Sequence, residues 1–120
     1  MKVTELSFVA VPVTDVARAR NFYEKVLGLK MEGEFLDGRW IEYDLGGATL
    51  AIANVNIDWR PSDQGTSAAL EVDDFNAAIS DLKRGNVTFD AEPFETPVCH
   101  MAVIKDPDGN KLIIHKRKSA

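Results

Sequence analysis

The sequence has one cysteine and no long apolar run, and each absence excludes a class of protein. Cys99 has no second cysteine with which to form an internal disulfide, which is typical of proteins from reducing compartments. No apolar run reaches the roughly 18 residues that a membrane helix needs. The N-terminus also lacks the apolar stretch of a signal peptide. We therefore expect a cytoplasmic protein with no membrane partner.

Positive charge is also in short supply. The chain contains 14 Lys and Arg against 19 Asp and Glu, so its net charge is −5 at neutral pH. No nucleic-acid partner is expected, because neutralising phosphates requires a basic surface. The length of 120 residues, with 45% hydrophobic and 28% charged residues, is that of one ordinary globular domain. We expect a single domain over residues 1–120.

The expected secondary-structure elements follow the same order twice. In the first half, the pattern predicts a strand over 6–13, a helix from Asp15 to Gly28, and strands over 30–35, 40–45 and 48–55. In the second half, it predicts a strand over 67–74, a helix over 75–84, and strands near 88–89, 100–104 and 111–116. The shared order of strand, helix and three strands predicts two βαβββ modules, about 1–57 and 65–118.

Two motifs carry a resemblance to a known superfamily. The first has the form F-Y-x-x-x-L-G-L and occupies residues 22–29, at the end of the first predicted helix. The second is D-P-D-G-N in residues 106–110, immediately before the last predicted strand. Over essentially its whole length the chain resembles the vicinal oxygen chelate superfamily. That superfamily includes glyoxalase I, extradiol dioxygenases, fosfomycin-modifying enzymes, methylmalonyl-CoA epimerase and bleomycin resistance proteins.

The resemblance implies an architecture but no single reaction. It implies an α+β fold in which two βαβββ modules form a curved mixed sheet around a cavity, with the helices on the convex side. It also implies a homodimer, because two modules commonly complete a cavity with sheet from a partner subunit. One scaffold can support many activities, so whether this chain is an enzyme stays open.

Members of this superfamily that do chemistry usually bind a divalent ion through His, Glu or Gln at four strand positions. The resemblance places those positions at Phe8, Ala51, Ser67 and Ile113. Three of these side chains contain no donor atom, and a serine hydroxyl is a poor ligand. We therefore expect neither a metal nor another cofactor at the usual site.

A displaced metal site is the alternative. If the 106–110 turn pairs Lys105 with Asn110, His100 lies directly opposite His115 on the neighbouring strand. By strand alternation, His115 shares a face with Ile113. Glu71 likewise shares a face with Ser67, so the set of His100, His115 and Glu71 forms the alternative divalent metal site.

The remaining side chains expected on the concave face are aromatic, apolar or small. Trp40 and Phe8 offer flat faces there, and Trp59 lies in a loop that can cover the cavity mouth. The small Ala10, Pro12, Ala69 and Ala102 are expected on the same face and leave room for a ligand. The expected ligand-binding residues are Phe8, Trp40, Ala51, Trp59, Ser67, Glu71, His100, Ile113 and His115.

Two functions from different classes follow from these residues. The first is a metal-independent binding protein of the bleomycin-resistance type that sequesters a small aromatic or antibiotic-like molecule. The second is a glyoxalase- or dioxygenase-type enzyme that uses the displaced metal site. In both cases the expected partner is a small molecule.

Overall fold

Each half of the chain folds into a four-stranded mixed sheet with a helical segment packed against one side. The computed structural model describes residues 1–2, 4–55 and 58–119. It divides into two compact units, Met1–Pro61 and Ser62–Ala120. The predicted end of the first module, residue 57, lies outside the described residues. Within the described ranges, no helix is long and apolar enough to cross a membrane.

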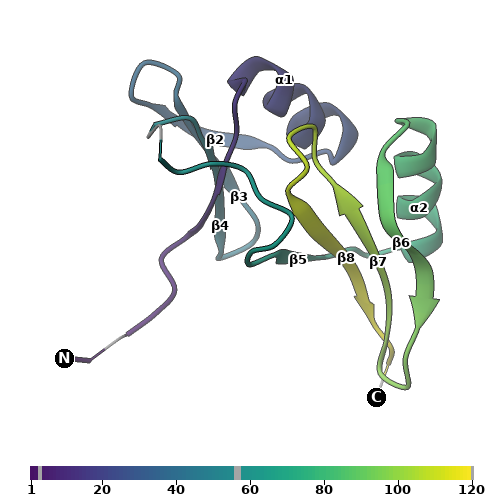
Figure 1. Ribbon diagram of the computed structural model, residues 1–120. Coiled ribbons are helices and arrows are strands. Elements are labelled where there is room, and N and C mark those ends of the chain that lie inside the picture. The colour runs from purple at the N-terminus through teal and green to yellow at the C-terminus, as the bar shows by residue number, and fades with distance from the viewer. Residues whose placement is uncertain (3, 56–57, 120) are drawn as a thin grey trace. The chain divides into compact units, whose positions relative to one another are not determined.

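The first unit begins with a strand and a helical segment, and three strands follow (Figure 1). Its elements are β1 (Val9–Pro12), α1 (Val16–Arg20), the π-helix η1 (Asn21–Val26), β2 (Met31–Phe35), β3 (Trp40–Asp44) and β4 (Thr49–Ala53). The strand order across the sheet is β1-β4-β3-β2. β1 runs parallel to β4, and the two other pairings are antiparallel.

The second unit repeats this topology. Its elements are β5 (Ala68–Glu71), α2 (Phe75–Arg84), β6 (Thr88–Glu95), β7 (Cys99–Lys105) and β8 (Lys111–Arg117). The strand order is β5-β8-β7-β6, with β5 parallel to β8 and the other pairs antiparallel. The predicted α+β class, with the βαβββ order occurring twice, is confirmed.

An aspartate begins the helical segment of each unit. The side chain of Asp15 accepts a hydrogen bond from the backbone N–H of Arg18 at 3.0 Å. Asp74 accepts one from the N–H of Ala77, also at 3.0 Å. Both aspartates have extended backbone, as an N-cap requires, and each bond satisfies an N–H that has no partner within the helix.

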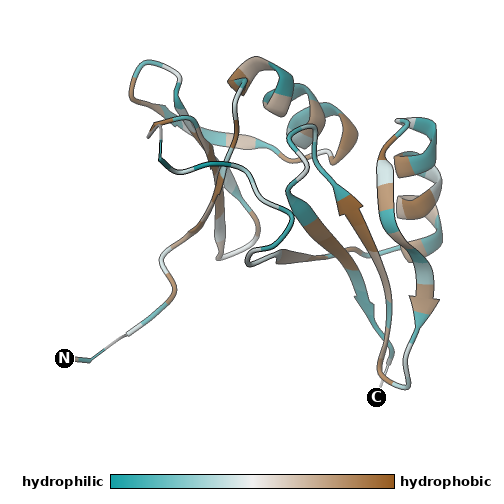
Figure 2. Cartoon of the chain, viewed as in Figure 1, coloured by the Kyte–Doolittle hydropathy of each residue, from teal (hydrophilic) through white to brown (hydrophobic). Residues whose placement is uncertain are grey.

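The core of each sheet lies on the side that the helical segment covers. In the first sheet, this side contributes Ile41, Tyr43, Leu50 and Ile52, each at most 2% exposed. In the second sheet, it contributes Ala102, Ile104, Leu112 and Ile114, also at most 2% exposed. α2 alternates hydrophobic and hydrophilic residues around its turns, as a helix that covers one side of a sheet should (Figure 2).

The first helical segment changes its hydrogen-bond pattern part-way along. A single helix is predicted from Asp15 to Gly28, but from Asn21 onward the segment is π-helical. The N–H of Leu27 donates to the carbonyl of Phe22, five residues earlier, at 2.9 Å. The wider turn buries two consecutive aromatic residues, with Phe22 6% and Tyr23 0% exposed.

Several strands differ in length from their predictions, and two of these differences affect where side chains lie. The first strand was predicted over 6–13, but β1 begins at Val9, so Phe8 lies just outside the sheet. The strand predicted near 88–89 extends as β6 to Glu95 and includes Pro93. A proline fits there because β6 is an edge strand, where the missing N–H costs no ladder bond. The register of β6 against β7 shifts twice along its length.

One buried carboxylate holds the turn between β7 and β8. Asp106 Oδ1 accepts hydrogen bonds from the backbone N–H groups of Asp108 and Asn110, each at 2.9 Å. Its Oδ2 accepts from the side-chain amide of Asn110 at 2.9 Å. Asn110 Oδ1 in turn accepts from the N–H of Ser62 at 3.1 Å. The D-P-D-G-N motif therefore specifies this turn through its side chains as well as its backbone.

Candidate functional site

The side of each sheet opposite its helical segment, here called the helix-free face, carries most of the predicted ligand-binding residues. On the first sheet, alternation and register assign to this face Ala10, Pro12, Gly33, Phe35, Trp40, Glu42, Ala51 and Ala53. On the second sheet, they assign to it Ala69, Glu71, Ala91, Phe94, Met101, Val103, Ile113 and His115.

Aromatic rings meet on the helix-free face of the first sheet. The ring of Phe8 stands edge-on to that of Trp40, with centroids 5.4 Å apart and planes at 90°. The Trp40 indole N–H donates to Oε2 of Glu42 at 2.9 Å, which fixes the orientation of the indole. Phe8 is 45% exposed, whereas Ala51 has no exposed surface. This face therefore presents an apolar ring surface with one carboxylate beside it.

A carboxylate and an imidazole pair on the helix-free face of the second sheet. Glu71 in β5 is the direct parallel neighbour of His115 in β8, and its Oε1 lies 2.5 Å from His115 Nδ1. Its Oε2 accepts the backbone N–H of Arg117 at 2.8 Å. The bond from His115, and then that from Arg117, lowers the pKa of the Glu71 carboxyl below its ordinary value. Both carboxylate oxygens are thus engaged in holding the imidazole.

The final hairpin does not have the register on which the displaced metal site depends. Lys105 pairs with Lys111 rather than with Asn110. The reason is the turn itself, because Asp106 donates its backbone N–H to the carbonyl of Asn110 and so holds both residues out of the strands. The correction moves every later pair by one residue, so the partner of His115 is Met101.

This shift moves His100 to the other face of the second sheet. His100 pairs with Lys116, and its ring lies 5.5 Å from that of Phe75 in α2. Ala102, predicted on the concave face, also faces the helix as the partner of Ile114. The displaced metal site of His100, His115 and Glu71 is therefore wrong, because the two imidazoles point to opposite sides of one sheet. Among the described residues, no three His, Cys, Asp or Glu side chains gather as a metal site.

The chain was compared with known families and proteins. The family model of the glyoxalase/bleomycin resistance protein/dioxygenase superfamily matches residues 5–114. The chain belongs to this superfamily. A lactoylglutathione lyase of Neisseria meningitidis serogroup A is 30% identical over 119 residues, covering 89% of this chain and 86% of that protein. A probable lactoylglutathione lyase of Vibrio parahaemolyticus is 29% identical, covering 90% and 87%.

Solved structures share the fold of this superfamily member. TnmS3, an antibiotic binding protein from Streptomyces sp. CB03234, matches with a TM-score of 0.82 at 24% identity, covering 98% of this chain and 99% of that chain. Lactoylglutathione lyase from Agrobacterium tumefaciens matches with a TM-score of 0.75 at 16% identity, covering 96% and 95%. At these identities the likeness establishes the fold, and it confirms the resemblance seen in the two motifs.

The side chains at the four positions that the resemblance assigns to the superfamily's metal ligands do not fit a divalent ion. Phe8 and Ile113 present only carbon, and the Phe8 ring is engaged with Trp40. Ala51 is buried and has no donor atom. The Ser67 hydroxyl donates to the carbonyl of Lys111 at 2.7 Å. A cation that left water for these side chains would lose its oxygen ligands without replacement.

Trp59 stands apart from the other predicted ligand-binding residues. It is half-buried in the segment between β4 and β5 and belongs to no strand. The structure thus brings together Phe8 with Trp40 and Glu71 with His115. It places Ala51 and Ile113 on the same faces as these pairs, and it separates His100 from them.

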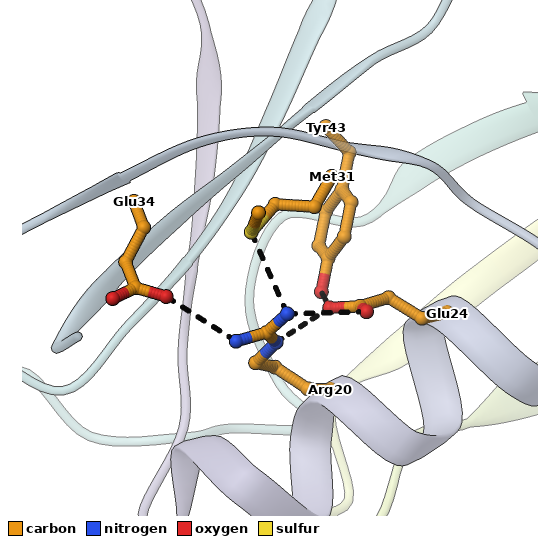
Figure 3. Close-up of polar contacts among 5 residues, drawn as sticks. All are labelled: Arg20, Glu24, Met31, Glu34 and Tyr43. Carbon is orange, nitrogen blue, oxygen red and sulfur yellow. Dashed lines mark hydrogen bonds and ion pairs between the residues drawn. The ribbon is translucent and has the colours of Figure 1, made fainter.

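A polar cluster, made of Arg20, Glu24, Met31, Glu34 and Tyr43, lies between the helical segment and the first sheet (Figure 3). The Arg20 guanidinium bonds both oxygens of Glu24, at 2.6 and 3.3 Å, and reaches Glu34 at 3.3 Å. The Tyr43 hydroxyl donates to Glu24 Oε2 at 2.9 Å. The Arg20 bond lowers the pKa of Glu24 against the opposing effect of burial. Burial, and then the Glu24 bond, raises the pKa of Tyr43, so the phenol keeps its proton.

The sequence offered only part of this cluster. The spacing of Arg20 and Glu24, four residues apart in a helix, indicates an ion pair. Tyr43 and Glu34 come from other elements, and no local pattern connects them to the helix.

Phe94, on the helix-free face of the second sheet, was missed for a different reason, because the predicted strand ended before it.

Proposed function

We propose that the chain is a metal-independent binding protein that holds a small aromatic or antibiotic-like molecule without altering it. The observation that carries the proposal is the Phe8–Trp40 pair. At a position where the superfamily's enzymes place a metal ligand, this chain has a phenylalanine whose ring contacts a tryptophan on the helix-free face. Aromatic surfaces bind planar apolar molecules through stacking and edge contacts, which a metal site does not offer.

Two further features support this proposal. Glu42 on the first sheet and the Glu71–His115 pair on the second each supply polar groups that orient a ligand on an otherwise apolar face. A structural neighbour, TnmS3, is an antibiotic binding protein. Ala51 contributes small lining on the first sheet, where Trp59 covers the ligand, and Ser67 and Ile113 contribute small or apolar lining on the second sheet.

The ligand test is a thermal-shift screen with small aromatic and antibiotic-like compounds. A compound that binds only the folded state raises the melting temperature. Replacing Trp40→Ala should weaken binding of each hit by about tenfold or more, because a buried aromatic contact is lost. The matched control is Leu36→Ala, which removes an apolar side chain, 54% exposed, from the β2–β3 turn of the same unit. A screen without hits, or hits that bind Trp40→Ala equally well, would contradict the proposal.

The lactoylglutathione lyase names of the relatives favour an enzyme as the second candidate. Metal analysis of the purified protein, followed by a lactoylglutathione-forming assay with added nickel or zinc, separates the two. We expect less than stoichiometric metal and no product. Stoichiometric metal together with turnover would replace the binding protein by the enzyme.

We also propose that the protein is a homodimer, as the superfamily resemblance implies, and that it is cytoplasmic, which its single cysteine favours. Sedimentation at micromolar concentration tests the assembly. We expect a mass of about twice the 13.3 kDa of one chain. A mass of one chain would exclude the dimer.

A further inference from the structure

The Glu71–His115 pair is built in a way that leaves one imidazole nitrogen for a ligand. The carboxylate of Glu71 can only accept hydrogen bonds, so the Nδ1 that faces it carries the proton. Because both Glu71 oxygens are held, one by His115 and one by the N–H of Arg117, the ring cannot turn without breaking this arrangement. In the neutral imidazole the other nitrogen, Nε2, is then a hydrogen-bond acceptor.

The acceptor is directed away from Glu71, because the two nitrogens lie on opposite sides of the ring. Among the described residues, no hydrogen bond reaches His115 Nε2. The His115 side chain is 23% exposed, so it is neither sealed in the core nor free in solvent. A carboxylate that fixes an imidazole and leaves its second nitrogen available is an arrangement that accepts a proton or a hydrogen bond from a bound molecule.

The surroundings of His115 on this face are apolar. Its cross-strand neighbour is Met101, and Ile113 lies two residues away on the same strand and face. Both side chains are half-buried, so part of each remains open to contact. These two side chains therefore offer an apolar surface on the same face as the imidazole.

We propose that Glu71 and His115 form a recognition site for the hydroxyl group of a phenolic or enolic ligand. The hydroxyl donates its hydrogen bond to Nε2 of His115, while Glu71 positions the imidazole and stabilises positive charge on it. This inference rests on the proposed function, since it names the class of aromatic molecule that the protein selects. On this proposal, selectivity for aromatic ligands that carry a hydroxyl group comes from residues of the second sheet.

The test compares two probes that differ only at the hydroxyl, 2-naphthol and 2-methoxynaphthalene. Calorimetric titration of the intact protein should show tighter binding of the naphthol, by about five- to tenfold, the usual worth of one hydrogen bond. His115→Leu keeps an apolar side chain at the site and should bind both probes with equal affinity. Glu71→Gln should reduce the preference to about twofold. An amide has only one acceptor oxygen, so its N–H₂ group opposes the N–H of Arg117, and the side chain holds the imidazole less firmly.

Two matched controls lie in the same unit. His100→Gln changes the other histidine, which faces α2, and Glu95→Gln changes a carboxylate that pairs with Lys118. Both variants should keep the full preference for naphthol. The wild-type protein gives an independent readout, because its two histidines each give one Cε1–H proton signal in NMR spectra. Naphthol should shift the signal of His115 and leave that of His100 unchanged.

The outcomes separate this inference from the proposed function. If both probes bind wild-type protein equally, or if His115→Leu keeps the preference, hydroxyl recognition by this pair is excluded while aromatic binding stands. If neither probe binds and the aromatic screen has no hits, the proposed function fails and the inference fails with it. A preference that disappears only in the Glu71 and His115 variants supports both.

Discussion

The two units share one strand order and differ in how closely the helical segment packs and bonds to the sheet. In the first unit, Tyr23 is fully buried and stacks on Tyr43, whose hydroxyl joins the polar cluster with Arg20 and Glu24. In the second unit, α2 buries only Leu82. The same topology therefore forms with many side-chain contacts between helix and sheet in the first unit and with few in the second. The strand pairings and the helix caps set this topology, and the side chains between helix and sheet do not.

The helix-free faces differ as well. The first sheet presents aromatic rings and a carboxylate that accepts an indole N–H, whereas the second presents a carboxylate bonded to an imidazole. The comparison shows that duplicated architecture does not impose duplicated chemistry, since residues on this face are under no packing constraint from the helix.

Tyr23→Ala should have the largest effect on stability. Removing a fully buried aromatic side chain leaves a cavity and should lower the free energy of unfolding by about 4 kcal/mol. The counterpart Phe75→Ala, in the helix of the second unit, removes a half-buried ring and should cost about 2 kcal/mol.

Urea denaturation measures both changes. Trp40 and Trp59 lie in the first unit, so their fluorescence follows that unit, whereas circular dichroism follows the whole chain. If Tyr23→Ala prevents folding, Tyr23→Leu is measured in its place, because leucine retains most of the volume of the tyrosine side chain. If Tyr23→Ala and Phe75→Ala lowered the free energy of unfolding equally, the helix would contribute as much to stability in the second unit as in the first.

The turns before the last strand of each sheet give the next comparison. Asp106→Ala should destabilise the protein by about 2 kcal/mol, because it deprives two backbone N–H groups and one buried amide of their acceptor. The first sheet uses glycines at the equivalent turn, and Gly46 has φ +71 with open space around it. Gly46→Ala should therefore cost only the strain of that conformation, about 1 kcal/mol. Thermal unfolding measures both losses. A larger loss of stability for Gly46→Ala than for Asp106→Ala would contradict this expectation.

Arg20→Met should have the smallest effect of the three, and the effect should depend on pH. The folded protein holds the pKa of Glu24 below its unfolded value of 4.5, chiefly through Arg20. Ionised Glu24 therefore stabilises the fold above that value, and this stabilisation is lost as the pH falls through the folded pKa. At neutral pH we expect a loss of about 1 kcal/mol, because both groups are partly exposed. The difference from wild type should shrink as the solution is acidified below about pH 4.5.

The matched control for Arg20 lies in the second unit. Lys83 pairs with Glu92, but the two side chains are 50% and 66% exposed. Lys83→Met should change stability by at most about 0.5 kcal/mol. A loss as large as that of Arg20→Met would show that the polar cluster contributes no more than a surface ion pair.

Much of the fold could be predicted because its signals are local. Asp15 and Asp74 precede their helices, and alternation put Glu71 and His115 on one face, as the pairing of β5 with β8 requires. The register of the last hairpin could not be predicted, since it depends on how the Asp106 side chain closes the turn. That one-residue difference put His100 on the face of His115, whereas in the structure the two imidazoles lie on opposite faces of the sheet.

The remaining errors also have physical causes. A π-helical segment such as η1 arises from a shift in backbone hydrogen bonding, for which the residues around Phe22 give no pattern distinct from an α-helix. β6 looked short because Pro93 interrupts its sequence, although an edge strand accepts a proline. The contact of Trp40 with Phe8 could not be predicted, since it depends on where β1 begins and on how the strands pair.

Pro93 and the irregular register of β6 bear on how the molecules behave when concentrated. A free sheet edge invites extended segments of other chains to pair with it, which is the first step of many fibrils. On β6 the row of donors is interrupted by the proline and bent by the two register shifts. Another chain therefore cannot follow this edge for its full length, and this exposed edge strand is protected against aggregation by its own irregularity.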